Sequence, residues 1–181
     1  FADLGNKVYC VDKDKSKINS LKNSISPIYE PGLEDLIRNN LRAKRLIFTD
    51  DLQKAIEDSQ IIFICVGTPT KKGSNLVDLS QVYSVTKSIS KYIKNYKIIV
   101  TKSTVPVTTG DQIEKIISKR VKKSLFEVVS NPEFLREGEA IRDFKYPDRI
   151  VIGSNNKKIF KKMELLYEPP IKKGAKFFCS S

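Results

Sequence analysis

Short apolar runs alternate along this chain with segments whose apolar residues recur at helical spacing. The run IIFICV at residues 61–66 is apolar at every position, as expected of a strand that is covered on both faces. In a later segment, Ile113, Ile116 and Ile117 recur every three or four residues, which is typical of an amphipathic helix. The alternation predicts an α/β fold built on a doubly wound parallel sheet. The predicted strands are Lys7–Val11, Leu46–Phe48, Gln60–Val66, Lys97–Thr101, Phe126–Ser130, Arg149–Ile152 and Ala175–Cys179.

The composition predicts a single folded domain without a metal site. The 181 residues include 40% hydrophobic and 30% charged residues, which is an ordinary globular balance. The chain has no histidine, which excludes histidine-based acid–base catalysis and the common zinc sites. Its three cysteines lie far apart and form no CxxC pair, so a reducing, cytoplasmic setting fits best. The run at 61–66 is too short to cross a bilayer, and we expect no membrane partner.

The formal net charge of +12 has two interpretations. A strongly basic domain is typical of nucleic-acid-binding proteins. Alternatively, the charge belongs to solvated helix faces that are rich in lysine. The lysines are spread over nearly every predicted helix, and the chain has no helix-turn-helix pattern or arginine-rich segment. We therefore favour solvated helix faces and expect no nucleic-acid partner, while a basic binding module remains the alternative.

Polar or small residues follow four of the predicted strands. Ligands of doubly wound sheets bind outside the carboxyl ends of the strands, so these residues are candidates for a binding crevice. Each cluster alone is typical of a turn, whereas the four together predict a binding site along one edge of the sheet. The clusters are Asp12; Gly67-Thr68-Pro69-Thr70; Lys102-Ser103-Thr104-Val105-Pro106; and Asn131-Pro132-Glu133-Phe134-Leu135.

Asp12, which follows the first predicted strand, has two interpretations. A carboxylate in this place can accept hydrogen bonds from both ribose hydroxyls of NAD and would repel the 2′-phosphate of NADP. The neighbouring Lys13, Lys15 and Lys17 would instead attract a phosphate. Alternatively, Asp12 caps the helix that follows it. The residues by themselves leave these interpretations open.

The other clusters contain candidate functional groups, each with a structural alternative. Gly67 allows the backbone to approach a ligand closely, or simply forms a turn. Thr104 can donate a hydrogen bond to a substrate or a water, or it begins a helix. Glu133 and Glu137 would share one face if their segment were helical. Two carboxylates in a partly dry cleft suit general acid–base chemistry, although either glutamate alone is typical of a surface.

Six segments occur in one order along nearly the whole chain: FADLGNKVYCVDKD, ISPIYEPGLEDL, VGTPT, KSTVPVTTG, SNPEFLREGEAIRDF and PDRIVIG. Together they resemble the UDP-glucose/GDP-mannose dehydrogenase family, and the sequence YPDRIVIG is similar to the UDP-glucose branch. The resemblance implies a Rossmann-like NAD-binding domain, an enzyme that oxidises UDP-glucose to UDP-glucuronate with two NAD, and a homo-oligomer of at least two copies. In the family, a catalytic cysteine carries a thioester intermediate that is then hydrolysed.

The resemblance also implies roles for individual residues. Asp12 and Lys17 would hold the adenosine ribose of NAD. Glu133 would act as the acid–base residue of thioester hydrolysis, and Thr104 would help to position the water. The remaining NAD contacts would come from Val66, Gly67, Thr68, Pro69, Thr70, Ser103, Thr104, Val105 and Glu137. The UDP-sugar would contact Glu133, Phe134, Leu135, Arg136 and Glu137.

The resemblance further implies that parts of the family's enzyme are missing from these 181 residues. The ribose acid is expected about 20 residues after the glycine-rich fingerprint, whereas Asp12 is only the twelfth residue. We therefore expect residues 1–181 to form one NAD-binding domain without its first strand and glycine-rich loop. The family's central helix and C-terminal UDP-sugar domain would also be absent. The catalytic cysteine would belong to the missing part, since Cys179 does not match its motif.

A missing first strand would leave a gap at the centre of the sheet, between the strands that end near Asp12 and Val66. Two strand edges would then lack backbone partners. We expect the 181-residue chain to be marginally stable, to bind NAD weakly and to be inactive by itself. The alternative is an inactive remnant or a basic binding module without dehydrogenase activity.

Overall fold

The structure, a computed structural model, describes residues 1–71, 73 and 76–180. All seven predicted strands are present, with ends within two residues of the prediction. They are β1 (Val8–Val11), β2 (Leu46–Thr49), β3 (Ile61–Ile64), β4 (Lys97–Thr101), β5 (Phe126–Ser130), β6 (Arg149–Gly153) and β7 (Lys176–Ser180). The helices are α1 (Lys15–Lys22), α2 (Leu33–Arg42), α3 (Leu52–Asp58), α4 (Ser80–Ser90), α5 (Thr109–Ser118), α6 (Ala140–Lys145), α7 (Lys157–Leu166) and α8 (Glu168–Lys172), with two 3₁₀ turns at Ala2–Leu4 and Lys123–Leu125.

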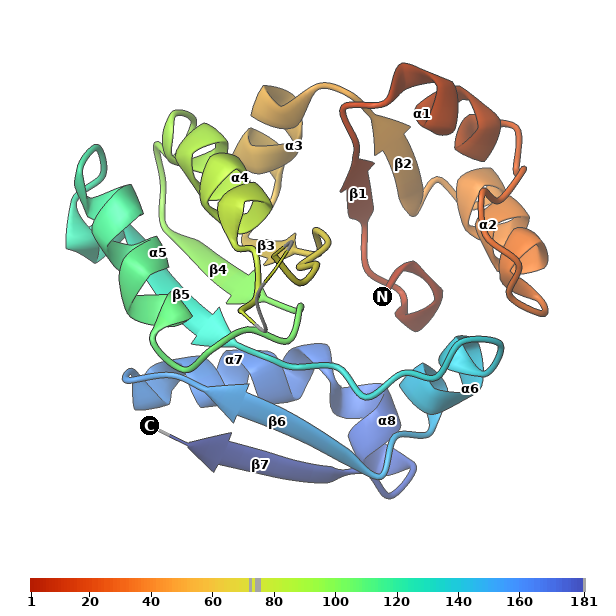
Figure 1. Ribbon diagram of the computed structural model, residues 1–181. Helices are drawn as coiled ribbons and strands as arrows, with labels where there is room; N and C mark the ends of the chain where they lie inside the picture. Colours follow the sequence, from red (N-terminus) through yellow and green to blue (C-terminus); the bar gives the residue numbers. More distant parts are fainter. Residues whose placement is uncertain (72, 74–75, 181) are drawn as a thin grey trace.

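The strands form two sheets, one with the order β1-β2 and one with the order β3-β4-β5-β6-β7. The pairs β1–β2, β3–β4, β4–β5 and β6–β7 are all parallel. This parallel-dominated α/β arrangement confirms the predicted fold class. In the described part of the chain, no strand pairing joins β1 to β3, which matches the expectation of unpaired edges between these two strands (Figure 1).

One junction in the larger sheet runs against the predicted all-parallel order. Strand β6 pairs antiparallel to β5, through Ser130 and Gly153. After β5 the chain continues in the same direction to α6 and then returns as β6 (Figure 1). A parallel neighbour would require a crossover back to the starting edge of the sheet, and the connection does not make that crossover.

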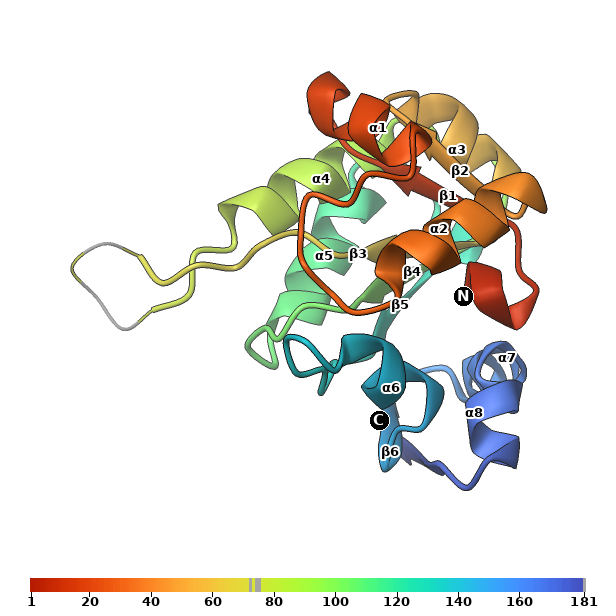
Figure 2. The same cartoon turned by 90° about the vertical axis from the view of Figure 1, so that its right-hand side faces the viewer.

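Helices cover both faces of the five-stranded sheet (Figures 1 and 2). One core lies on the side of α4 and α5 and includes Ile99 and Phe126. The other lies on the side of α7 and includes Val100, Ile152 and Met163. Successive residues of β4 thus contribute to opposite faces, and all five residues of this strand are buried.

The β1–β2 sheet has a smaller core of its own. Its buried apolar residues are Ile18, Ile37 and Phe48, from α1, α2 and β2. None of the four residues of β1 is fully buried. Since local stability follows buried apolar contacts and paired backbone, this half of the molecule is the less stable one.

We predict that the amides of β1 and β2 exchange with solvent at least about a hundredfold faster than those of β4, because the smaller core and the unpaired edge of β1 favour local opening. Hydrogen exchange followed by mass spectrometry measures this difference. Phe48→Ala should raise exchange in β1–β2 alone, whereas the matched core substitution Val100→Ala should raise it throughout the chain. Equal protection of β1 and β4 would contradict the prediction.

Candidate functional site

The carboxyl ends of β3, β4 and β5 lie side by side and bring three of the four predicted clusters together. Ile64 pairs with Thr101, and Thr101 pairs with Ser130. The loops that follow are joined directly, because the Ser103 hydroxyl donates a 2.8 Å hydrogen bond to the carbonyl oxygen of Val66. These three loops therefore lie along one edge of the sheet, and the binding crevice predicted there stays a prediction.

Asp12 lies at the carboxyl end of β1, in the other sheet. Its Oδ2 is 2.6 Å from Lys17 Nζ, and its Oδ1 accepts a 3.0 Å hydrogen bond from the backbone N of Asp14. The Lys17 hydrogen bond lowers the pKa of Asp12, so the carboxylate stays charged. The side chain of Asp12 keeps 31% exposure, which leaves this acid accessible to a ligand.

The helix-cap interpretation of Asp12 is wrong. The cap of α1 is Asp14, whose carboxylate accepts hydrogen bonds from the backbone N of Ser16 and Lys17. Asp14 takes this role because it directly precedes the helix, whereas Asp12 still follows the strand. A partly exposed carboxylate beside an ammonium group, at the end of a parallel strand, has the acceptor oxygens that two ribose hydroxyls require.

The segment after β5 is not helical, so Glu133 and Glu137 do not share a helix face. Residues 131–136 have no regular structure, residues 137–139 form a turn, and α6 begins at Ala140. Pro132 disfavours helical backbone at the residue before it, and Gly138 has the left-handed φ of 79°. The carboxylate of Glu133 instead accepts a hydrogen bond from the backbone N of Leu135, at 2.5 Å.

Arg136 holds this segment against α6. Its Nε and its terminal nitrogen donate to both carboxylate oxygens of Asp143, at 3.0 and 2.7 Å. The backbone N of Arg136 donates to the same carboxylate at 3.0 Å. Such two-point pairs fix geometry as well as charge. The guanidinium group predicted to contact a UDP-sugar is therefore paired with Asp143 of α6.

A buried polar network lies behind these three loops. Asn131 is 1% exposed, and its Nδ2 donates to the carbonyl oxygen of Val151 at 3.0 Å. Its Oδ1 accepts hydrogen bonds from the Tyr167 hydroxyl at 2.5 Å and from Lys102 Nζ at 3.5 Å. Burial lowers the pKa of Lys102 and raises that of Tyr167.

This network fixes the start of the segment that carries Glu133. Lys102 and Asn131 belong to the clusters predicted after the strands, although their hydrogen bond to one another was not predicted. No local pattern distinguishes Tyr167, which reaches Asn131 from 36 residues away.

The remaining predicted residues line the rim of the same edge. Thr104 is exposed and Val105 is partly buried. Thr104 does not begin a helix, since α5 starts at Thr109. The loop that starts at Val66 folds back on itself, with Thr70 bridged to Val77. Gly67, Pro69 and Thr70 are exposed and Thr68 is partly buried; Phe134, Leu135 and Glu137 are exposed.

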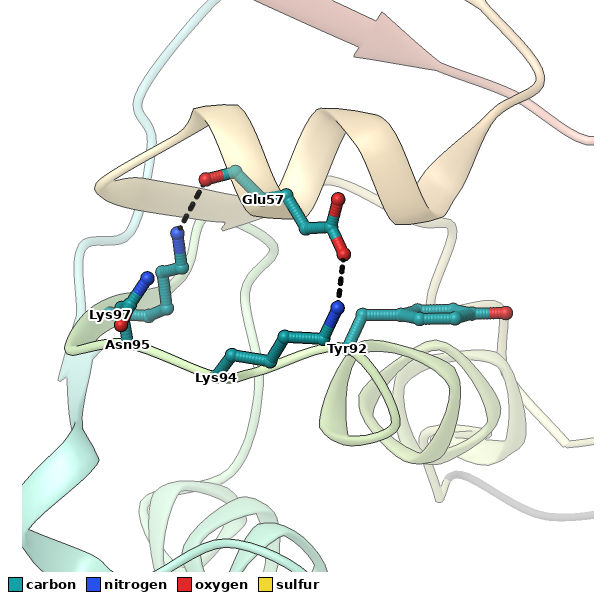
Figure 3. Close-up of a pocket in the computed structure, with 5 residues that line it drawn as sticks. All are labelled: Glu57, Tyr92, Lys94, Asn95 and Lys97. Carbon is teal, nitrogen blue, oxygen red and sulfur yellow. Dashed lines mark hydrogen bonds and ion pairs between the residues drawn. The ribbon is translucent and has the colours of Figure 1, made fainter.

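A hollow of about 210 Å³ lies at the opposite end of β4 (Figure 3). Lys97 Nζ donates there to the carbonyl oxygens of Glu57 and Ser59, at 3.1 and 2.6 Å. Lys94 Nζ binds the carboxylate of Glu57 at 2.7 Å. Both lysines satisfy groups at the end of α3, so we interpret this hollow as structural.

In the described residues, no group of three or more cysteine, aspartate or glutamate side chains is placed to hold a metal ion. None of the helices in that same part of the chain combines the length and apolar content needed to span a membrane.

Comparison with known proteins gives consistent matches. Residues 1–171 match a model described as the UDP-glucose/GDP-mannose dehydrogenase family, NAD binding domain. The chain is 53% identical over 153 residues to UDP-glucose 6-dehydrogenase of Rhizobium meliloti, covering 84% of this chain and 35% of that protein. It is 51% identical over 170 residues to UDP-glucose 6-dehydrogenase TuaD of Bacillus subtilis, covering 93% and 37%. The chain thus spans little more than a third of the length of these relatives.

Solved structures give the same match. A UDP-glucose dehydrogenase from Pyrobaculum islandicum superposes with a TM-score of 0.93 at 32% identity, covering 99% of this chain and 42% of that one. A GDP-mannose dehydrogenase from Pseudomonas aeruginosa superposes with a TM-score of 0.89 at 34% identity, with the same coverage.

We predict that Asp143 titrates far below an ordinary aspartate. Hydrogen bonds from Arg136 lower its pKa from 3.8 to about 2. A lowered pKa in the folded state means that the pair contributes stability above pH 3.8, which is lost as the pH falls toward about 2. Carboxyl ¹³C NMR should show this low midpoint, and Arg136→Gln should return it toward 3.8. An ordinary midpoint in the unsubstituted chain would contradict the pairing.

Proposed function

This chain belongs to the UDP-glucose/GDP-mannose dehydrogenase family, and we propose that it provides the NAD-binding domain of an enzyme that oxidises UDP-glucose to UDP-glucuronate. The observation that carries the proposal is the alignment of β3, β4 and β5, whose ends place the Val66, Ser103 and Asn131 loops on one edge. Ligands of doubly wound sheets bind at such an edge.

We propose that Asp12 and Lys17 hold the adenosine ribose of NAD. The Asp12 carboxylate has an accessible face, and Lys17 keeps it charged. The rest of the cofactor would lie along Val66–Thr70, Ser103–Val105 and Glu137. Bound NAD would supply the hydride acceptor for oxidation of the sugar alcohol, and the residues of this chain would hold it in position for that chemistry.

Glu133 is proposed as the acid–base residue of thioester hydrolysis. Its carboxylate is held by the backbone N of Leu135, and its loop begins at the buried Asn131. In this role the carboxylate takes a proton from the attacking water while Thr104 orients that water. The segment from Glu133 to Glu137 would contact the UDP-sugar.

The thioester itself is assigned to a cysteine other than Cys10, Cys65 and Cys179. Burial raises the pKa of Cys10 to about 11, and it also raises the pKa of Cys65 and of Cys179. A nucleophilic cysteine needs a lowered pKa, so none of these thiols is activated. We further propose a cytoplasmic homo-oligomer, on the resemblance and on the free thiols, without nucleic-acid or membrane partners.

A chimera tests the proposal: this chain replaces the matching 170 residues of TuaD. We expect this TuaD chimera to form UDP-glucuronate. Glu133→Gln should lower kcat at least about a hundredfold because a base is lost while its shape is kept. The KM for UDP-glucose should change little, and the matched control Glu139→Gln in the same loop should leave both constants nearly unchanged.

An inactive but folded TuaD chimera would contradict the proposed function. Weaker UDP-glucose binding with an unchanged chemical step in Glu133→Gln would contradict only the role of Glu133.

We predict that the TuaD chimera prefers NAD over NADP, because the charge of Asp12 repels a 2′-phosphate. Asp12→Ala should weaken NAD binding by roughly tenfold, the value of a good charged hydrogen bond. It should also reduce the ratio of the affinity for NAD to the affinity for NADP. Asp14→Asn is the matched control, since it removes a nearby charge and keeps a helix-capping side chain. Titration calorimetry with both cofactors measures the effect. Equal affinity of the unsubstituted chimera for both would show that the lysines near Asp12 dominate.

A further inference from the structure

The loop between α1 and α2 extends from the β1–β2 sheet to the start of α6 (Figures 1 and 2). At its end, one carboxylate oxygen of Glu30 accepts a 2.9 Å hydrogen bond from the backbone N of Gly138. The other oxygen accepts a 3.3 Å hydrogen bond from the backbone N of Ile141. These partners lie 108 and 111 residues further along the chain. Glu30 therefore joins the half of the molecule that carries Asp12 to the segment that carries Glu133 and Glu137.

Two glycines allow this approach. Gly138 and Gly32 both have a left-handed φ of 79°, which side chains rarely adopt. At Gly138 the left-handed backbone forms part of the turn that leads from the irregular segment into α6. At Gly32 it ends the loop and starts α2, and a Cβ there would lie 4.0 Å from Ile141 Cδ1. The two glycines thus let the α1–α2 loop come close to the turn before α6, and the Glu30 carboxylate binds that turn.

The segment from Asn131 to Glu139 depends on such contacts, because it has no helix or strand of its own. Asn131 anchors its start through the carbonyl oxygen of Val151. Arg136 anchors its middle to Asp143 in α6. Both contacts lie within the half formed by the five-stranded sheet and α6. Glu30 anchors the end of the segment, next to Glu137, and does so from the half that carries Asp12.

We propose that Glu30 is a positioning residue of the dehydrogenase site. By holding the N–H groups of Gly138 and Ile141, its carboxylate sets where Glu137 and Glu133 lie relative to the ribose-binding pair of Asp12 and Lys17. This inference rests on the proposed function. Glu30 touches neither cofactor nor substrate in this role; it acts through the turn that it binds.

The first test measures the contact itself in the 181-residue chain. Glu30→Gln replaces one acceptor oxygen with an amide donor, so one of the two N–H groups loses its partner. Amide exchange should speed up by roughly tenfold at whichever of Gly138 and Ile141 loses its acceptor, as the loss of one hydrogen bond implies. The matched control is Glu34→Gln, because the Glu34 carboxylate also accepts a backbone hydrogen bond, from Ser26 N in the same loop. Unchanged exchange at both amides in Glu30→Gln would overturn the proposal.

The second test separates positioning from stability, in the TuaD chimera. Glu30→Gln should lower kcat by roughly tenfold, because displaced catalytic groups reduce the rate. The KM for NAD and the NAD-over-NADP preference should stay within about threefold of the unsubstituted values, since Asp12 and Lys17 are intact. Glu34→Gln should leave kcat unchanged. A lower melting temperature with unchanged kcat in Glu30→Gln would show a structural role only and would overturn the positioning role.

The two tests also separate this inference from the proposed function. An unsubstituted TuaD chimera that folds without activity contradicts the proposed function, while the exchange measurement still decides whether Glu30 holds the turn. An active chimera that Glu30→Gln does not impair contradicts the inference alone.

Discussion

The parallel pairing of β3, β4 and β5 organises the larger sheet and both of its cores. All five residues of β4 are buried, and Ile99 and Val100 have no exposed surface. Each fully buried aliphatic side chain contributes about 1.5–3 kcal/mol to the free energy of unfolding. A shift of this strand would therefore disrupt both cores. The register that burial fixes also aligns the ends of β3, β4 and β5. Three loops of polar residues therefore start from the same edge of the sheet.

Beyond the ladder, the site depends on side chains that bind backbone. The segment after β5 carries the proposed acid–base residue but has no regular structure. Two of its backbone N–H groups have side-chain acceptors, since Asp143 binds that of Arg136 and Glu30 binds that of Gly138. At the start of the segment, the Asn131 side chain donates to the carbonyl oxygen of Val151 in β6. An irregular segment bound at both ends and in the middle can hold a carboxylate in one place, as catalysis requires.

The half that carries Asp12 is positioned by a different kind of contact. No strand pairing joins β1 to β3 in the described residues, so side chains connect the two halves. The Tyr9 hydroxyl donates to Asp58 at 2.6 Å, and Lys145 Nζ lies 2.7 Å from Asp3. The Phe1 ring also packs 4.9 Å from Phe63. The position of Asp12 relative to the other loops thus depends on a few polar and aromatic contacts.

The apolar runs of the sequence predicted the seven strands and the α/β fold class, because apolar side chains concentrate in strands that line a core. The same runs placed Asp12 and the loop after Val66 directly after strands, while the roles of these residues stay predictions. The three-dimensional structure was needed to find the reversed direction of β6, the non-helical course of the segment from Glu133 to Glu137, and the choice of Asp14 as helix cap.

The partners of Asn131 and Glu30 were also decided by the tertiary structure alone. Periodicity records which face of an element is buried, and that is a local property of the chain. A hydrogen bond between Glu30 and Gly138 depends on distance in space between residues 108 positions apart, and no local pattern carries that information.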